Sequence, residues 1–463
     1  MNLLSSIQTL FTVITVTISC LKMSDTQKYV PPSDMNMGPK SNAHQKRNLF
    51  VDALALLFGM SSWLGVTSSY LQLPLIISTM PEGWSMPAYM TVVVQSSNII
   101  SFAYVFYQKY APKKLNDAYL IYFTMSMGCL TAIGMAFFYQ NTITINGKEH
   151  SIAYLIFVFL FATVGTVSSV LFLPFMGRFR ECYLVSYMCG QGMNGLFTSI
   201  LTLIQGIGVP ECIPDTDGKL IKYIPPARFG TQTFFLLVFG LLLISTIAFI
   251  LLNKMEVCKK ELAAGIVMEG NEYYYENEDR HDVATGEVPE NVLNLSTFNY
   301  VKLLSAMVLI GFFGNGIFPG LQSYSSLPYG FLIYHLVASL ASIGNAIGSF
   351  IAQFVPHTSI RILDFLIVIV IVLGVYIFYA AVKNPFPPFL HTEFGPVFMI
   401  IQWMFFIGIQ SYMKTSIATI FRYQEGKSLV LMASTSLVCS VVGSIFNLFI
   451  VTYTQLFVSY EPC

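Results

Sequence analysis

Long apolar stretches separated by short polar breaks run along the chain from residue 49 to residue 456. Because a helix needs about 20 mostly apolar residues to cross the hydrocarbon core of a bilayer, this pattern predicts about eleven membrane-spanning helices. They are expected at 49–78, 86–108, 118–139, 152–176, 183–206, 230–253, 298–320, 329–355, 360–382, 396–421 and 428–456. Turn and charge signals such as Pro81-Glu82-Gly83 mark the breaks between them. The predicted fold class is therefore an all-α polytopic membrane protein.

One long polar insertion, residues 254–297, falls between the sixth and seventh predicted helices. It is acidic and rich in Tyr and has no apolar periodicity, so it predicts a flexible cytoplasmic linker. The linker divides the chain into a first lobe of six helices (49–253) and a second lobe of five (298–456). Residues 1–48 are expected to form a cytoplasmic N-terminal tail, and residues 457–463 an extracellular C-terminal tail.

The distribution of Lys and Arg near the helix ends predicts the orientation. With the N-terminus in the cytoplasm, many more of these residues lie on the inner side than on the outer side, as the positive-inside rule requires. The C-terminus is then extracellular, which agrees with an odd number of helices. Cys212 and Cys463 are both expected outside the cell, where they either form a disulfide or stay free.

Composition narrows the class further. The chain is 55% hydrophobic and only 10% charged, and its formal net charge is zero, so nothing points to nucleic-acid binding. The eight cysteines form no pattern with metal-ligand spacing, and we expect no metal and no cofactor. The sequence predicts no oligomeric state; the expected partners are the lipid bilayer and the transported solute.

Few charged residues lie inside the predicted helices. Asp52, Glu181, Lys302 and Asp364 fall near helix ends, and no Asp or Glu occupies the middle of a span. Carriers driven by protons or sodium usually place a carboxylate there to bind the coupling ion. The pattern therefore favours facilitated diffusion of a neutral solute.

Clusters of neutral polar and aromatic residues stand in place of charges. In the first helix Trp63, Thr67 and Tyr70 follow i, i+4, i+7 spacing and share one face, and Gln72 follows. Pro74 is expected to loosen this helix near Tyr70. The stripe either faces the substrate, which we favour, or marks a kinked helix whose polar groups are satisfied by its neighbours.

Three later helices contribute further candidates for substrate binding. Gln191 and Asn194 lie three residues apart in a Gly-rich stretch, where ligand contact and helix packing are equally good interpretations. Asn315 is flanked by glycines in a segment expected to be interrupted, and interrupted spans often carry binding sites. Tyr412 lies in an unusually polar stretch of the tenth helix. We expect Trp63 and Tyr70 to stack on the substrate, Tyr412 to stack or hydrogen-bond, and the others to hydrogen-bond.

Several strings in the chain resemble the eukaryotic riboflavin transporters, solute carrier family 52. They include Gly59-Met60 through Pro74, Pro81-Glu82-Gly83-Trp84, Gly190 through Gly195, and Gln322 through Gly330. The resemblance covers roughly residues 50 to 463 and implies sodium-independent uptake of riboflavin at the plasma membrane. Members of the family often have Asn, Trp and Glu at the positions of Thr67, Tyr70 and Gln72, and Glu at that of Gln191. Two carboxylates are thus replaced by amides here.

The chemistry of riboflavin agrees with these residues. Its flat ring can stack on aromatic side chains, and its uracil-like edge presents an N–H between two carbonyls, which an amide can match. A nucleoside would suit the same residues, so a carrier for nucleosides or another flat neutral solute is the alternative within the class. A membrane receptor that binds its ligand without transporting it is the alternative from another class. An enzyme is not expected, because the spans contain no catalytic pair of residues.

Overall fold

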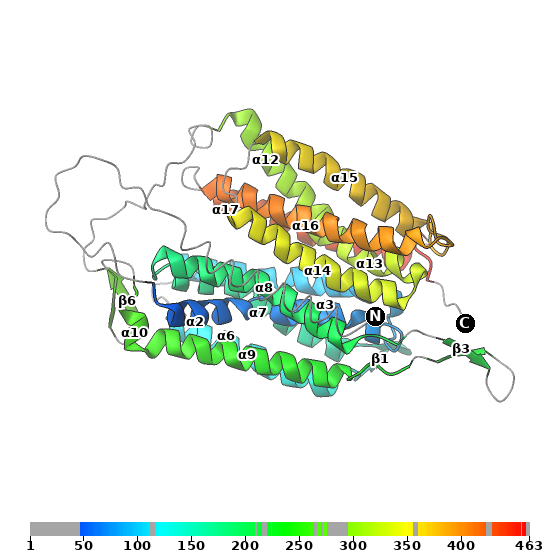
Figure 1. The fold of residues 1–463 in the computed structure, drawn as a ribbon, viewed down its shortest axis with the longest axis horizontal. Coiled ribbons are helices and arrows are strands. Elements are labelled where there is room, and N and C mark those ends of the chain that lie inside the picture. The colour runs from blue at the N-terminus through cyan, green and yellow to red at the C-terminus, as the bar shows by residue number, and fades with distance from the viewer. Residues whose placement is uncertain are drawn as a thin grey trace.

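The computed structural model describes residues 47–110, 116–208, 211–214, 220–223, 225–262, 266–269, 272–275, 295–354, 360–422, 428–454 and 456–459. These residues form two groups of long helices whose axes run roughly along the length of the molecule (Figure 1). The first group consists of α2 (Leu49–Met60), α3 (Leu64–Ile76), η1 (Gly83–Ser85), α4 (Met86–Ser96), α5 (Asn98–Tyr110), α6 (Asp117–Phe138), α7 (Ile152–Met176), α8 (Glu181–Gln205) and α9 (Thr231–Lys254). The second consists of α12 (Thr297–Leu309), η2 (Ile310–Ile317), α13 (Phe318–Ser326), η3 (Leu327–Tyr329), α14 (Phe331–Phe354), α15 (Ile360–Val382), α16 (Phe394–Arg422) and α17 (Ser428–Tyr453).

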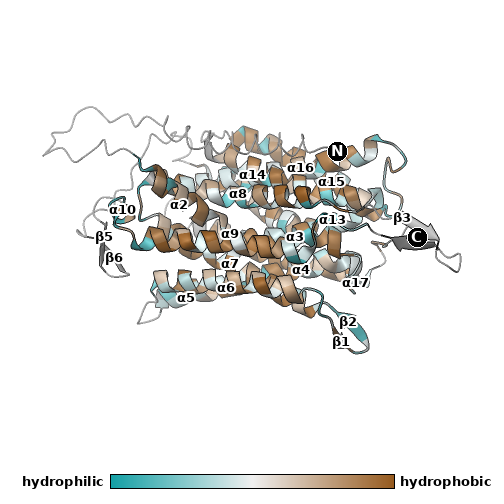
Figure 2. Ribbon diagram, turned by 60° about the horizontal axis from the view of Figure 1, so that its bottom comes forward, coloured by the Kyte–Doolittle hydropathy of each residue, from teal (hydrophilic) through white to brown (hydrophobic). Residues whose placement is uncertain are grey.

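The helices have the length and apolarity of membrane spans. Within the described ranges, nine are long and apolar enough to cross a bilayer, and there are ten when α2 and α3 count as one bent span. Figure 2 shows their hydrophobic residues in the middle of the molecule and hydrophilic residues gathered at its two ends. The remaining predicted span, 183–206, forms α8, which is as long as the others but carries many Gly, Ser, Thr and amide residues. The polytopic helical class is confirmed, and the number eleven stays a prediction.

The first span has a bend that the sequence did not predict, before the stretch where Pro74 is expected to loosen it. The axes of α2 and α3 meet at 53°, and the break covers residues 61–63. There the Ser61 hydroxyl donates to the Phe58 carbonyl at 2.7 Å, and the backbone N–H of Ser62 reaches back three residues instead of four. Pro74 lies inside α3, less than one turn from its end, and because it has no N–H it cannot donate the helical hydrogen bond to the Tyr70 carbonyl. The prediction that Pro74 loosens the helix near Tyr70 stays a prediction.

The two ends of the helices differ in character. At the end that we call the hairpin end, β1 (Ile143–Ile145) pairs with β2 (Lys148–His150), and β3 (Glu211–Pro214) pairs with β4 (Leu220–Tyr223). At the opposite end, the linker end, lie α10 (Glu256–Lys259) and the hairpin of β5 (Ile266–Glu269) and β6 (Glu272–Tyr275) (Figure 1). The predicted tail 1–48, apart from its last two residues, and most of 254–297 fall outside the described residues. Cys463, half of the suggested disulfide, also falls outside them.

Ion pairs hold the linker end of the first lobe together. The buried Asp52 carboxylate pairs with Arg47 and accepts a hydrogen bond from the Ser186 hydroxyl of α8 at 2.8 Å. Glu261, which is 4% exposed, binds Arg180 at 2.7 Å and the Tyr183 hydroxyl at 2.8 Å. The beginning of the predicted linker is therefore packed against the helices.

The same segment buries the thiol of Cys258 beside Glu261, and burial followed by the nearby carboxylate raises the pKa of the thiol to about 11. The thiol stays protonated at neutral pH and acts as a small packing residue.

Close helix packing in the second lobe depends on glycine. A Cβ placed on Gly348 of α14 would lie 2.0 Å from the carbonyl oxygen of Gly408 in α16. That oxygen belongs to the backbone, so a side chain at 348 can be accommodated only if the two helices separate.

We expect Gly348→Val to lower the free energy of unfolding by about 1–3 kcal/mol, the usual cost of overpacking a well-packed interior. Gly240→Val is the matched control, because a Cβ at that helical glycine meets nothing within 4 Å. Unfolding of the two purified variants in detergent measures the difference. Equal stability of the two would contradict the packing account.

Candidate functional site

A cavity of about 270 Å³ lies between the two lobes. Its size is close to the lower end of the range of about 300–1,000 Å³ for small-molecule sites. Helices α3 and α4 form the wall on the side of the first lobe, and η2, α13, α14 and α16 form the opposite wall. The lining residues are Val66, Thr67, Tyr70, Leu71, Thr91, Val94, Gln95, Asn315, Pro319, Gln322, Ala338, Ala341, Ser342, Asn345, Trp403 and Ile407.

Hydrogen bonds fix the polar groups on the first-lobe wall. The Thr91 hydroxyl donates to the carbonyl of Pro87 at 2.7 Å, which leaves its oxygen to accept from the Tyr70 hydroxyl at 3.1 Å. Because its hydroxyl is held in this way, Tyr70 presents its ring to the cavity in one orientation.

A hydrogen bond between the lobes crosses one edge of the cavity. The Gln95 side-chain N–H donates to the backbone carbonyl of Asn315 at 3.3 Å, and the Gln95 side-chain oxygen accepts from Asn98 at 3.1 Å. The bond uses only the backbone of Asn315, so its side-chain amide stays available to a ligand. Asn315 lies in η2, a π-helical stretch within the seventh span, and such distortions are frequent at functional sites. The interruption predicted from the Gly-rich sequence is therefore a local π-helix and not a break.

Trp403 is a rigid and almost completely buried part of the second-lobe wall. Its indole N–H donates to the Ser325 hydroxyl at 3.1 Å, and its ring packs edge-on against Phe406 with centroids 5.9 Å apart. The side chain is only 1% exposed, so these contacts lock its orientation.

The other polar groups of the second-lobe wall are neutral. Gln322 and Asn345 contribute amides, and Ser342 contributes a hydroxyl that donates to the Gly195 carbonyl of the first lobe at 3.4 Å. Asn345 is solvent-exposed although it lines the cavity, so the cavity is open beside it.

The structure brings three of the eight predicted site residues together and places the other five elsewhere. Thr67, Tyr70 and Asn315 line the cavity, from both lobes. Gln72 is fully buried and donates to the side-chain oxygen of Gln205 at 2.7 Å, a pair between α3 and α8.

The remaining four lie outside the cavity lining. Trp63 packs over Gly165 in the first-lobe core. Gln191 donates to the hydroxyls of Ser62 and Tyr187 at 3.2 and 3.1 Å. Asn194 is buried within α8, and Tyr412 packs against the core of the second lobe.

Six polar or aromatic lining residues escaped the sequence analysis: Thr91, Gln95, Gln322, Ser342, Asn345 and Trp403. Gln322 belongs to a Ser/Tyr-rich stretch that resembles an outer loop in sequence, but it lies in α13. Thr91 and Gln95 are one turn apart on α4, a spacing that would have marked a polar face.

Two lobes of spanning helices around a polar and aromatic cavity are the architecture of a solute carrier that works by alternating access. Comparison with known proteins identifies the family of carriers. Residues 47–459 match the model of solute carrier family 52, riboflavin transporter, and the chain belongs to this family.

Individual relatives align with this chain over nearly their whole length. The chain is 30% identical to riboflavin transporter 2 of Salmo salar over 90% of this chain and 98% of the relative. It is 31% identical to riboflavin transporter member 3-A of Danio rerio over the same shares. The human member 2 is 29% identical over 86% of this chain and 93% of that protein.

Solved structures share the fold at much lower sequence identity. A bacterial homologue of the human lysosomal transporter Spinster superposes with a TM-score of 0.51 at 12% identity, covering 86% of this chain and 81% of that one. The xylose transporter XylE of E. coli gives a TM-score of 0.50 at 11% identity, covering 89% and 92%. The prediction of a carrier-like fold is confirmed.

Proposed function

We propose that this protein carries riboflavin across the plasma membrane by sodium-independent facilitated diffusion, with the substrate bound in the cavity between the lobes. Family membership and the relatives named riboflavin transporters support the substrate. The observation that carries the choice of site is the cavity wall, where neutral amides and hydroxyls from both lobes surround Tyr70 and Trp403.

The chemistry of riboflavin suits this wall. The flat ring can stack on Tyr70, and an aromatic pair of this kind contributes about 0.5–1.5 kcal/mol beyond the area it buries. The uracil-like edge offers a donor between two acceptors, which complements the amide of Asn315. The hydroxyls of the ribityl tail can hydrogen-bond to Thr67 and to further amides of the wall. Thr67, Tyr70 and Asn315 are therefore the predicted residues that we retain for direct contact.

Alternating access requires contacts between the lobes that can open and close. Near the hairpin end, the Ser323 hydroxyl donates to the Trp84 carbonyl at 2.7 Å, and the rings of Trp84 and Tyr324 lie 6.0 Å apart. These contacts join η1 of the first lobe to α13 of the second. In the proposed cycle they separate when the cavity opens toward the hairpin end, which we take to be extracellular, with the N-terminus cytoplasmic and the C-terminus outside.

The other five predicted site residues have a different role in this proposal. They are Gln72, Gln191, Asn194, Trp63 and Tyr412. The three amides would hold helices in place, as Gln72 does by pairing with Gln205. Trp63 and Tyr412 would fill the cores of their lobes, so their substitution would change stability before it changes substrate affinity.

Uptake of labelled riboflavin by cells expressing the protein tests both the identity of the substrate and the independence of transport from sodium. We expect uptake to be unchanged when choline replaces sodium, and to be blocked by excess unlabelled riboflavin but not by excess uridine. Strong competition by uridine would favour a nucleoside carrier, and loss of uptake without sodium would overturn facilitated diffusion. Specific binding without accumulation would favour a receptor.

A further inference from the structure

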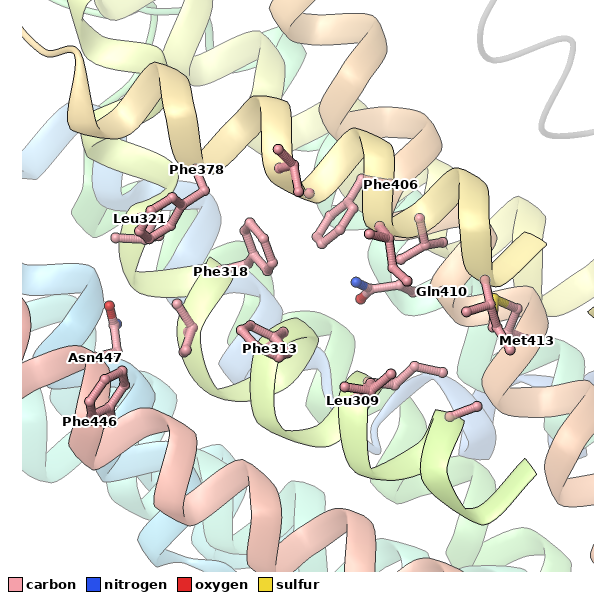
Figure 3. Close-up of a pocket in the computed structure, with 18 of the residues that line it drawn as sticks. Leu309, Phe313, Phe318, Leu321, Phe378, Phe406, Gln410, Met413, Phe446 and Asn447 are labelled. Carbon is pink, nitrogen blue, oxygen red and sulfur yellow. The ribbon is translucent and has the colours of Figure 1, made fainter. Parts of the chain in front are cut away.

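A second and larger cavity lies in the second lobe, away from the site between the lobes. It has a volume of about 610 Å³ and runs between the α12–η2–α13 segment and α15, and side chains of α16 and α17 complete its lining (Figure 3). We call it the lateral groove. All of its lining residues are apolar except two amides, Gln410 and Asn447.

The position of the groove follows from the unequal number of helices in the two lobes. In the first lobe the sixth span, α9, packs against the first span (α2 and α3) and the third (α6). The described part of the second lobe has five spans, and the groove lies between its first and third, α12–α13 and α15. The second lobe is therefore hollow where the first lobe is filled by a helix.

The groove opens to the lipid-facing side of the lobe. Val375 of α15 is 64% exposed and Phe446 of α17 is 48% exposed, although both line the groove. From Ala306 to Leu321 the groove follows the seventh span for 15 residues. At 1.5 Å per residue this is about 22 Å, most of the depth of a hydrocarbon core of about 30 Å. Phe457 closes the hairpin end, with its ring 5.5 Å from that of Tyr324.

One amide in the groove has no protein partner. Asn447 is 1% exposed, and neither its side-chain nitrogen nor its oxygen forms a hydrogen bond with the described residues. Leaving such a buried group unsatisfied costs about 1–3 kcal/mol. Asn447 lies six residues before the end of α17 at Tyr453, about 9 Å from the helix end at 1.5 Å per residue. Both polar atoms of an amide at that depth can be satisfied by a ligand that brings a donor and an acceptor.

We propose that the lateral groove binds a membrane sterol, whose hydroxyl hydrogen-bonds to Asn447 and whose rings lie against the exposed side chains of Phe313 and Phe446. A sterol hydroxyl both donates and accepts, which matches the two orphaned atoms of the amide. An acyl chain of a phospholipid has no such group, and it loses more conformational entropy than a rigid ring system when it is ordered.

A helix from another protein fits the walls less well. Helices associate in membranes through small residues that let their backbones approach. The groove is lined mainly by large side chains of Phe, Ile, Leu and Val, with Ala306 and Gly374 as the small residues. A flat apolar molecule can lie between such side chains where a second helix would collide with them.

The test uses full-length protein in liposomes and a photoreactive, alkyne-tagged cholesterol. We expect saturable labelling of the groove helices that unlabelled cholesterol competes away and phosphatidylcholine does not. Val375→Trp should reduce labelling at least fivefold by filling the groove from its rim, and Asn447→Leu should reduce it about tenfold by removing the amide. Val372→Trp is the matched control, because Val372 is 63% exposed on the same helix but does not line the groove.

Three results would overturn the proposal. One is equal labelling of Val375→Trp and Val372→Trp. Another is competition by phosphatidylcholine as strong as by cholesterol, which would make the occupant an acyl chain. The third is a cross-link from position 375 to a second protein chain, which would make the occupant a helix. None of these measurements depends on riboflavin transport, so the proposal can fail while the proposed function stands.

Discussion

Replacing Asn315 by Leu is expected to reduce riboflavin uptake at least about tenfold while the protein still folds and reaches the membrane. Asn315 lines the cavity, and the interlobe hydrogen bond from Gln95 ends on its backbone carbonyl, which the substitution keeps. The substitution therefore weakens substrate binding, because the polar edge of riboflavin would be left without a partner at a cost of about 1–3 kcal/mol. Initial uptake rates, normalised to the amount of protein at the cell surface, measure the effect.

Asn141→Leu is the control for this experiment. Asn141 is an exposed amide after the end of α6 and lies far along the chain from the cavity residues. Its substitution should leave uptake unchanged. If Asn315→Leu transported riboflavin as well as Asn141→Leu does, the cavity between the lobes would not be the substrate site in the form proposed.

Replacing Asp52 by Asn is expected to give the largest loss of stability, about 3–5 kcal/mol in the free energy of unfolding. The carboxylate is 0% exposed and neutralises Arg47, whose side chain is 12% exposed. The substitution removes the carboxylate charge that Arg47 and the Ser186 hydroxyl bind at the linker end of α2 and α8, and breaking a buried ion pair in this way is the cause of losses of this size. Chemical unfolding of the purified protein in detergent measures the change.

Asp364→Asn provides the comparison, since Asp364 also forms an ion pair, with Lys302 at 2.8 Å. Those side chains are 42% and 27% exposed, and exposed pairs contribute about 0–1 kcal/mol. Equal losses for the two variants would show that burial does not set the contribution of the Asp52 pair.

The sequence was sufficient to locate the helices, because every span needs about 20 mostly apolar residues to cross the bilayer. Residues 152–176, for example, were expected as a helix and form α7 over the same range. The bend of the first span was not predicted, for a local reason. Proline is the usual signal for a kink, but here the Ser61 hydroxyl competes for a backbone carbonyl and tightens the turn.

The site was predictable only in part, because polar residues inside a helical bundle have two uses that look alike in sequence. Gln72 and Asn315 are both amides in apolar surroundings, but Gln72 is satisfied by Gln205 and Asn315 faces a cavity. The partner of Gln72 is 133 residues away in the sequence. Trp403 was missed for the opposite reason, since an aromatic residue in an apolar span gives no sign that it faces a cavity.

Counterflow into liposomes tests the central claim most directly. Purified protein is reconstituted into sodium-free liposomes loaded with unlabelled riboflavin, and labelled riboflavin is added outside. A facilitative riboflavin carrier should accumulate the label transiently above its external concentration, and excess external uridine should not prevent this. Absence of any accumulation, from protein that still binds riboflavin, would contradict transport by alternating access.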